Sequence, residues 1–244
     1  MKKIIYLLNL IILTSCSSYY YYPTYQNIPS NTKANEIQAV YFVDIIANKG
    51  LALSYSLNKN IGVFTNYNNL STQSNLLFSD GGTYIADIGM YYFNNLKVDN
   101  ENIKITMSVS SAYSYGQEEC SEYSYEQSAE YYFNLNLHRF FLQPSFSYKS
   151  RFFDFGISSR ISYVNYTSNA DVIGPDLSKL TRTPYYFFEP HIFFGIGYKW
   201  IKLNYHFVKA ENINNARISF IEKSDYISLS INYDIDKLFK KKKQ

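Results

Sequence analysis

Hydrophobic and polar residues alternate with a period of two along most of the chain beyond residue 36. In residues 103–116, an apolar series faces a series of Lys, Thr, Ser and Ala; the apolar members include Ile103, Ile105, Met107, Val109, Tyr113 and Tyr115. The same alternation recurs in residues 51–58, 153–163, 186–198 and 225–233. Because successive side chains of a β-strand point to opposite faces, this pattern predicts strands with one apolar and one polar face.

The alternating stretches predict an all-β fold of about ten strands. They lie at 37–46, 50–58, 60–68, 83–94, 103–116, 130–148, 152–166, 185–198, 200–209 and 224–234. The polar faces carry Ser, Thr, Gly and Asn with few charges, whereas the outer faces of soluble β-sandwiches are usually rich in Lys and Glu. Long apolar stripes opposite small polar residues are typical of transmembrane barrels, apolar towards lipid and polar towards the lumen. We therefore expect an antiparallel up-and-down transmembrane β-barrel, with eight or twelve strands as alternatives.

The connections between these strands alternate in length. Short connections lie near 58–60, 94–102, 149–151 and 199–200, and long polar ones at 69–82, 117–129, 167–184 and 210–223. Outer-membrane barrels have short periplasmic turns and longer outer loops, so this alternation supports the same architecture. Strand 130–148 is too long for one crossing, and its first half is expected to project above the membrane.

The first sixteen residues have the pattern of a bacterial export signal. Lys2 and Lys3 precede an apolar run, Ile4 to Leu13, which has the length of a signal-peptide core and is too short to span a bilayer. Leu-Thr-Ser-Cys at residues 13–16 resembles the lipobox of bacterial lipoproteins, which implies that the mature chain begins at Cys16 and is acylated there. The alternative is an ordinary secretory signal with an incidental cysteine.

The remaining chain divides into three parts. Residues 16–35 contain two prolines and no periodicity, which predicts a lipidated, extended linker. Residues 36–235 form the barrel, and residues 236–244 form a basic tail containing Lys240 to Lys243. An even number of strands places both ends of the barrel on the periplasmic side, where a lipid on Cys16 would enter the inner leaflet.

Composition narrows the possible functions. Without the two leader lysines and the four of the tail, the chain has 17 basic and 20 acidic residues, so it lacks the clustered positive charge of a nucleic-acid-binding domain. With Cys16 acylated, Cys120 has no partner for a disulfide. Aromatic residues make up 19% of the chain, which suits interfacial girdles. The girdle candidates are Tyr67, Tyr84, Tyr92, Tyr115, Tyr148, Tyr166, Tyr186, Tyr198 and Tyr233.

A set of polar and charged residues falls on the predicted lumen face. Its members are Arg139, Gln143, Asp154, Arg160, Glu189, His191 and His206, with Asp87 and Lys202 beside them. Arg160 and Glu189 lie at similar depth on neighbouring strands, so we predict a lumen ion pair there, with His191 as a further candidate, because an unpaired buried charge is costly. We interpret the set as a polar network that closes the lumen.

Catalysis and metal binding receive less support. Glu189 and His191 share a face and serines are abundant, but nothing in the pattern brings a nucleophile within reach of the histidine, so we expect no enzyme activity. Three histidines without close His or Cys spacing predict no metal site and no cofactor.

The chain resembles uncharacterised outer-membrane lipoprotein barrels of Gram-negative bacteria in three stretches: HRFFLQPSFSYKSRFFDFGISSRISYVNY (138–166), FFEPHIFFGIGYKWIKLNY (187–205) and ISLSINYDI (227–235). More broadly, it is similar to small OmpA/OmpX-like and porin-like barrels. The resemblance implies the fold and the outer-membrane compartment, with the lipid bilayer and a covalent lipid as partners, and implies no reaction.

These observations predict a lipid-anchored outer-membrane barrel with a structural or surface-interaction role. Two alternatives remain open. A narrow channel would need an open lumen, and a tethered lipocalin-like barrel that binds a lipophilic ligand would point its aromatic side chains inward.

Overall fold

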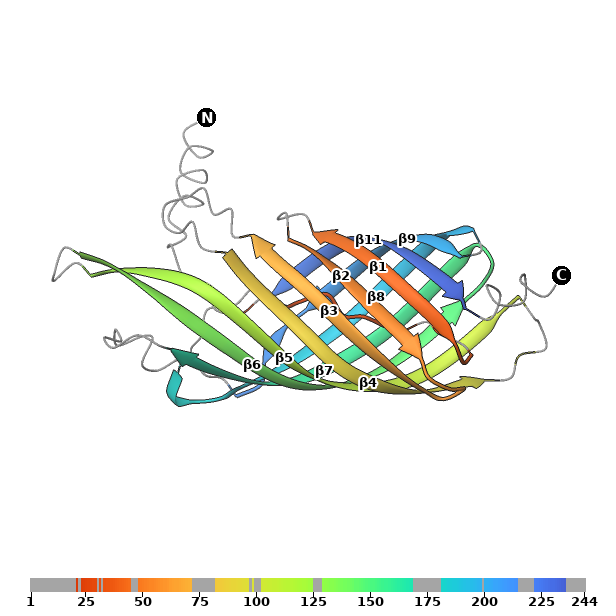
Figure 1. Ribbon diagram of the computed structural model, residues 1–244, viewed down its shortest axis with the longest axis horizontal. Coiled ribbons are helices and arrows are strands. Elements are labelled where there is room, and N and C mark those ends of the chain that lie inside the picture. The colour runs from red at the N-terminus through yellow and green to blue at the C-terminus, as the bar shows by residue number, and fades with distance from the viewer. Residues whose placement is uncertain are drawn as a thin grey trace, which may run out of the picture.

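The computed structural model describes residues 21, 23–29, 31, 33–44, 48–71, 82–96, 98, 102–124, 129–168, 181–198, 200–214 and 222–235, and these form a β-barrel (Figure 1). Cys16, the leader and the basic tail lie outside the described residues. So do the side chains of Cys120 and its neighbours. Within the described residues, no helix is long and apolar enough to cross a membrane.

Ten long strands and one two-residue strand make up the sheet. They are β1 (Glu36–Asp44), β2 (Lys49–Ser56), β3 (Ile61–Ser71), β4 (Gly82–Leu96), β5 (Lys104–Ser124), β6 (Ala129–Lys149), β7 (Phe153–Ser168), β8 (Tyr185–Tyr198), β9 (Ile201–Lys209), β10 (Glu211–Asn212) and β11 (Lys223–Asp234). Each long strand corresponds to one of the ten predicted from the alternation.

Antiparallel pairing closes the sheet into a ring. Consecutive strands pair from β1 to β9, β11 pairs with β9, and β1 pairs with β11 from Glu36 opposite Asp234 to Asp44 opposite Tyr226. The short β10 pairs with β8 near the start of that strand, at Phe187 and Phe188. The predicted all-β, up-and-down barrel of ten strands is therefore confirmed, and the alternatives of eight and twelve are not observed.

The two ends of the barrel differ. The turn rim carries the short connections 57–60, 97–103, 150–152 and 199–200, together with the start of β1 and the end of β11. The loop rim carries the connections 45–48, 72–81, 125–128, 169–184 and those around β10. Residues 117–124, which we predicted to begin a long loop, instead continue β5 and pair with β6 as far as Ser124 opposite Ala129. This β5–β6 hairpin extends beyond the rest of the ring (Figure 1).

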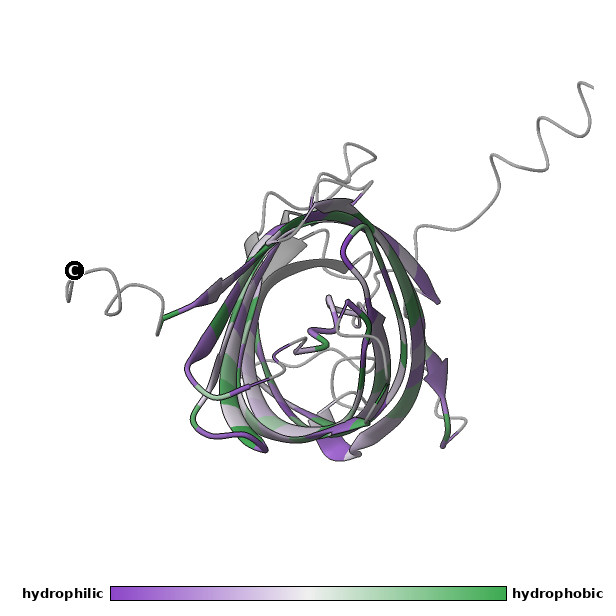
Figure 2. Cartoon of the chain, turned by 90° about the vertical axis from the view of Figure 1, so that its right-hand side faces the viewer, coloured by the Kyte–Doolittle hydropathy of each residue, from purple (hydrophilic) through white to green (hydrophobic). Residues whose placement is uncertain are grey.

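Apolar side chains cover the outside of the barrel. Strand β7 alternates between exposed and buried positions along its whole length, with Ile157 and Ile161 outward and Ser158 and Arg160 inward. Ile88 is 69% exposed and Ile196 is 64% exposed, although both are strongly hydrophobic. Viewed along the barrel, the strands form a closed ring (Figure 2). The predicted orientation of the stripes is thus the one observed.

The inner wall is less uniformly polar than we predicted. Most girdle candidates that the structure describes point outward or lie at the surface, but Tyr166 is buried inside the barrel, because it shares its strand parity with Arg160. Phe42, Phe64 and Phe141 also point inward and are buried. The lumen therefore contains aromatic rings as well as Ser, Asn and charged groups.

Glycines on the inner wall make room for three inward-facing aromatic rings. Gly62 pairs with Tyr91, Gly156 with Phe193, and Gly50 with Phe42 across neighbouring strands; these pairs are in direct register. A Cβ added at Gly156 would lie 2.2 Å from Cε1 of Phe193, and one at Gly62 would lie 2.2 Å from Cζ of Tyr91. Each ring thus lies over a position where only glycine fits.

Candidate functional site

A stretch of the chain's own N-terminal region occupies the lumen. We call residues 21–31 the lumen segment; Tyr21, residues 23–29 and Asn31 are described, and all of them are buried. The strands surround this extended chain on all sides in the end-on view (Figure 2). The sequence pattern predicted an extended linker here and did not place this stretch inside the barrel.

Backbone and side-chain hydrogen bonds fix the lumen segment to the wall. The Gln26 side-chain amide donates to the Glu189 backbone carbonyl at 2.8 Å, and Gln143 Nε2 donates to the Asn27 carbonyl at 3.0 Å. Tyr226 donates its hydroxyl hydrogen to the Pro23 carbonyl. A buried chain without a sheet partner must satisfy its carbonyls in this way, because an unpaired buried polar group costs free energy.

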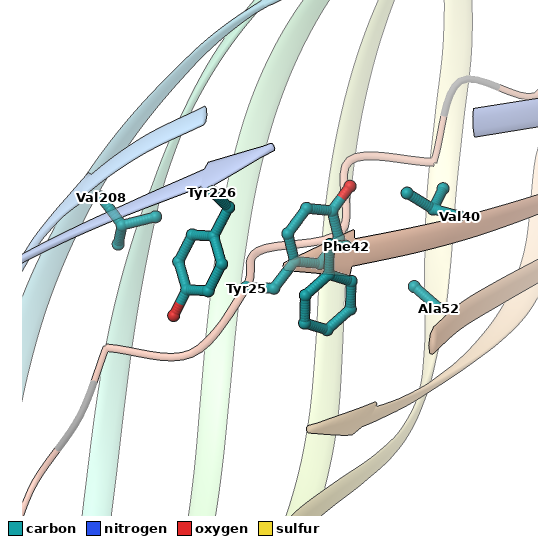
Figure 3. Packing of buried hydrophobic residues seen from close by; sticks show 6 residues of the cluster. All are labelled: Tyr25, Val40, Phe42, Ala52, Val208 and Tyr226. Atoms are coloured by element: carbon teal, nitrogen blue, oxygen red, sulfur yellow. The ribbon is translucent and has the colours of Figure 1, made fainter. Parts of the chain in front are cut away.

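Aromatic packing adds to these hydrogen bonds. Tyr25 stacks on Phe42 with ring centroids 4.2 Å apart and forms a T-shaped contact with Tyr226 (Figure 3). It forms a second T-shaped contact with His206. At the other part of the segment, Tyr21 stacks on Phe187 with centroids 3.8 Å apart. The inward-facing aromatic residues of the wall therefore form the surface on which two tyrosines of the segment lie.

Two buried ion pairs lie beside Tyr21. Arg139 Nη2 lies 2.9 Å from Asp87 Oδ1, and the predicted pair of Arg160 and Glu189 is in direct register and forms an ion pair. Tyr21 joins the two pairs, because its hydroxyl donates to Glu189 Oε1 at 2.7 Å and accepts a hydrogen bond from Arg139 Nη1 at 3.4 Å.

Further contacts complete this charged cluster, which we define as Asp87, Arg139, Arg160 and Glu189. Ser114 accepts from Arg139 Nε, Ser162 donates to Glu189, and Arg160 Nη2 donates to the Thr24 carbonyl at 3.2 Å. Both guanidinium groups also lie over the ring of Phe141. Two positive and two negative charges balance, as they must where all four side chains are fully buried.

The two lumen histidines belong to a separate hydrogen-bonded chain. His191 Nε2 lies 3.0 Å from His206 Nδ1, His191 Nδ1 lies 3.0 Å from Ser158 Oγ, and His206 Nε2 lies 2.8 Å from Ser228 Oγ. Ser158 in turn donates to Gln26 Oε1 at 2.9 Å. One arrangement satisfies every pair: Ser228 donates to His206, His206 to His191, His191 to Ser158, and Ser158 to Gln26. Both imidazoles are neutral in this arrangement.

Glu189 and His191 belong to different hydrogen-bonded groups. The Glu189 carboxylate is bound by Arg160, Ser162 and Tyr21, whereas His191 contacts Ser158 and His206. Among the described residues, no three His, Cys, Asp or Glu side chains gather as metal ligands.

The remaining predicted lumen residues also lie inside. Asp154 pairs with Lys202 at 3.0 Å, close to the turn rim, and Lys202 also donates to the Ser150 carbonyl at 2.9 Å. Gln143 binds the lumen segment through Asn27. The structure therefore brings the predicted residues into three groups, which are the charged cluster, the histidine chain and the Asp154–Lys202 pair, and places Gln143 apart from them, against the lumen segment.

Sequence reasoning missed the residues of the lumen segment, above all Tyr21, Tyr25 and Gln26. Two signals could have indicated them. Prolines and tyrosines together favour an extended, packed chain over a solvated one, and the inward faces of β1 and β8 carry unexplained aromatics at Phe42 and Phe187.

Comparison with known proteins identifies no family. No family model and no curated protein matches the chain. Among solved structures, it is similar to the crystal structure of the N-terminal β-barrel domain of Pseudomonas aeruginosa OprF, with 7% sequence identity and a TM-score of 0.28. The match covers 82% of this chain and 99% of that domain. A likeness at this TM-score supports no statement about function.

Proposed function

We propose that this chain is a lipid-anchored outer-membrane barrel with a structural or surface-interaction role, and that its lumen segment closes the lumen. The proposal is carried by one combination of features, an apolar outer wall around a lumen filled by buried side chains and by the chain itself. The long β5–β6 hairpin and the larger connections all lie at the loop rim, which we propose faces the outside of the cell.

The outer wall supports a membrane location over the tethered lipocalin-like alternative. Large apolar side chains, among them Ile88, Met90 and Ile196, are more than half exposed on the outside. In water such a continuous surface would promote aggregation, whereas in a bilayer it faces hydrocarbon. A lipocalin-like protein would keep the same residues inside and leave a cavity for its ligand.

The variant Cys16→Ser tests the lipid anchor and the membrane attachment of the barrel independently. Acylation of the full chain is followed by labelling with radioactive palmitate, and this label should be lost in the variant. Because the barrel itself holds the protein in the bilayer, the variant should remain in the outer-membrane fraction after alkaline carbonate and should need detergent for extraction. Release of the variant into the soluble fraction would instead favour a tethered soluble barrel.

Conductance distinguishes a closed barrel from a narrow channel. The purified full-length chain in planar bilayers should show no discrete conductance steps, and a variant lacking residues 17–33 should show them, because the deletion removes the chain that fills part of the lumen. Heat-dependent gel migration must first show that the deletion variant is folded. Steady steps from the full-length chain would support a channel, and a folded but silent deletion variant would mean that the segment does not close the lumen.

A further inference from the structure

The lumen segment runs in one direction along the barrel axis. Asn31 donates to the backbone carbonyl of Glu36, the first residue of β1, and therefore lies at the turn rim. Asn27 contacts Gln143, which is six residues from the turn-rim end of β6. Tyr21 contacts Glu189, which is nine residues from the turn-rim end of β8. From Asn31 through Asn27 to Tyr21, the contacts thus move towards the loop rim.

Towards its N-terminal end, the segment approaches the loop-rim end of β1. Pro23 accepts a hydrogen bond from Tyr226, and Tyr226 is paired with Asp44, the last residue of β1. The wall is low on this side, since β1 has nine residues and β2 has eight, whereas β5 and β6 have 21 each. At Pro23 the segment therefore lies near the loop-rim end of β1.

The length of the remaining chain restricts where Cys16 can lie. Cys16 precedes Tyr21 by five residues, which span at most about 18 Å. Tyr21 stacks on Phe187, and the eleven residues from Phe187 to the turn-rim end of β8 cover about 36 Å along the strand, or roughly 26–30 Å along the axis at the usual strand tilt. The route back is also occupied by residues 23–31. Cys16 therefore cannot reach the leaflet at the turn rim while the segment is in place.

From these distances we infer that the chain is threaded through its own barrel, and that a lipid on Cys16 enters the membrane leaflet at the loop rim. The C-terminal end of the barrel lies at the opposite rim, where Ile235 donates to the Asn35 carbonyl at 3.0 Å. This inference rests on the proposed lipid anchor and outer-membrane location. It replaces the expectation that the lipid enters the inner leaflet, because under the proposed orientation the loop rim faces the cell surface.

Three tagged chains test this threading. A short epitope is inserted between Ser18 and Tyr19, or into the connection 169–180 at the loop rim, or after Gln244. Each tagged chain must retain palmitate labelling and heat-dependent migration. Antibody binding is then measured on intact cells and after the outer membrane is permeabilised. We expect the N-terminal and 169–180 tags to bind antibody on intact cells, and the C-terminal tag to bind at least tenfold less until permeabilisation.

The inference is tested by which of the three tags bind antibody under the same conditions. If the N-terminal tag behaves like the C-terminal tag while the 169–180 tag binds antibody on intact cells, the threading is wrong and the outer-membrane proposal stands. If all three tags are shielded on intact cells, the proposed location is wrong. Antibody binding to the three tags is then measured on proteoliposomes in which the barrel has a single orientation. The threading still requires the N-terminal tag and the 169–180 tag to be accessible from the same side of the membrane.

Discussion

At the scale of single residues, the charged cluster shows why a narrow lumen needs paired charges. Arg160 and Glu189 are both fully buried, so neither can recover its hydration by moving. Ser162 and Tyr21 donate further hydrogen bonds to Glu189, and Arg160 donates one to the Thr24 carbonyl. Such a pair adds little net stability over apolar residues, but the loss of one partner leaves a buried charge without compensation.

Replacing one partner of this pair should therefore be much more costly than replacing both. Arg160→Met is expected to lower the free energy of unfolding by about 3–5 kcal/mol, because the Glu189 carboxylate stays buried without its cation. The double variant R160M/E189M should recover part of that loss. Urea unfolding in lipid vesicles, followed by the fluorescence of Trp200, measures both changes.

The pair formed by Lys209 and Glu211 provides the matched control. Both side chains are substantially exposed, so Lys209→Met should leave the urea midpoint nearly unchanged. If R160M and K209M shifted the urea midpoint equally, the buried pair would contribute no more to the stability of the barrel than the exposed pair.

A second prediction concerns the contact between Gly156 and Phe193. Gly156→Ala should lower the free energy of unfolding by about 1–3 kcal/mol, because the new methyl group overlaps the buried ring. Phe193→Leu removes the overlapping ring, so the double variant should be less destabilised than the sum of the two single variants. The same urea experiment, arranged as a double-mutant cycle, measures this coupling. Strict additivity would show that the ring moves aside freely.

At the scale of elements, the strands were predictable because their signal is local. Alternation with a period of two sets which side chains face the lumen, and the same parity brought Arg160 opposite Glu189. Tyr166 was misplaced because its position near a strand end was given more weight than its parity. The lumen segment could not be predicted in this way, since an extended chain that packs on several strands has no repeating pattern of burial.

The β5–β6 hairpin shows a second limit of local patterns. Polar and acidic residues in 117–129 favoured a loop, but the backbone of Gln117 to Ser124 is paired with β6 throughout. Backbone pairing here needs only the adjacent strand β6, which follows β5 in the sequence. Polar side chains do not prevent this pairing, because this part of the hairpin lies outside the ring.

The paired backbone predicts where proteases cut. Because a protease must bind an unpaired, extended stretch, limited digestion of the barrel in vesicles should cut β5–β6 within 125–128 and leave 117–124 intact. Mass spectrometry of the fragments identifies the cleavage sites. A proline substitution at Ser121 should open the hairpin and expose 117–124 to cleavage, whereas early cleavage of the unmodified chain inside 117–124 would contradict the pairing.

At the scale of the whole molecule, barrel width explains why the lumen holds both side chains and a chain. A barrel of eight strands is just wide enough for side chains to fill its interior, and diameter grows with the number of strands. Ten strands leave extra space, and here one extended segment occupies part of it, with inward aromatics and glycines adjusting the fit. Aromatic stacking and hydrogen bonds thus join the segment to the ring.

Closure of this ring depends on β11, which pairs with β9 on one side and β1 on the other. Truncation after Ile235 removes the basic tail but no paired residue, so the shortened chain should still migrate as a folded, heat-modifiable barrel. Truncation after Asp225 removes every β11 residue that pairs with β1 and leaves two open edges, which are not stable in a bilayer. That chain should show only the unfolded gel position, with or without heating. A folded band from it would mean that the ring can close without the contact between β1 and β11.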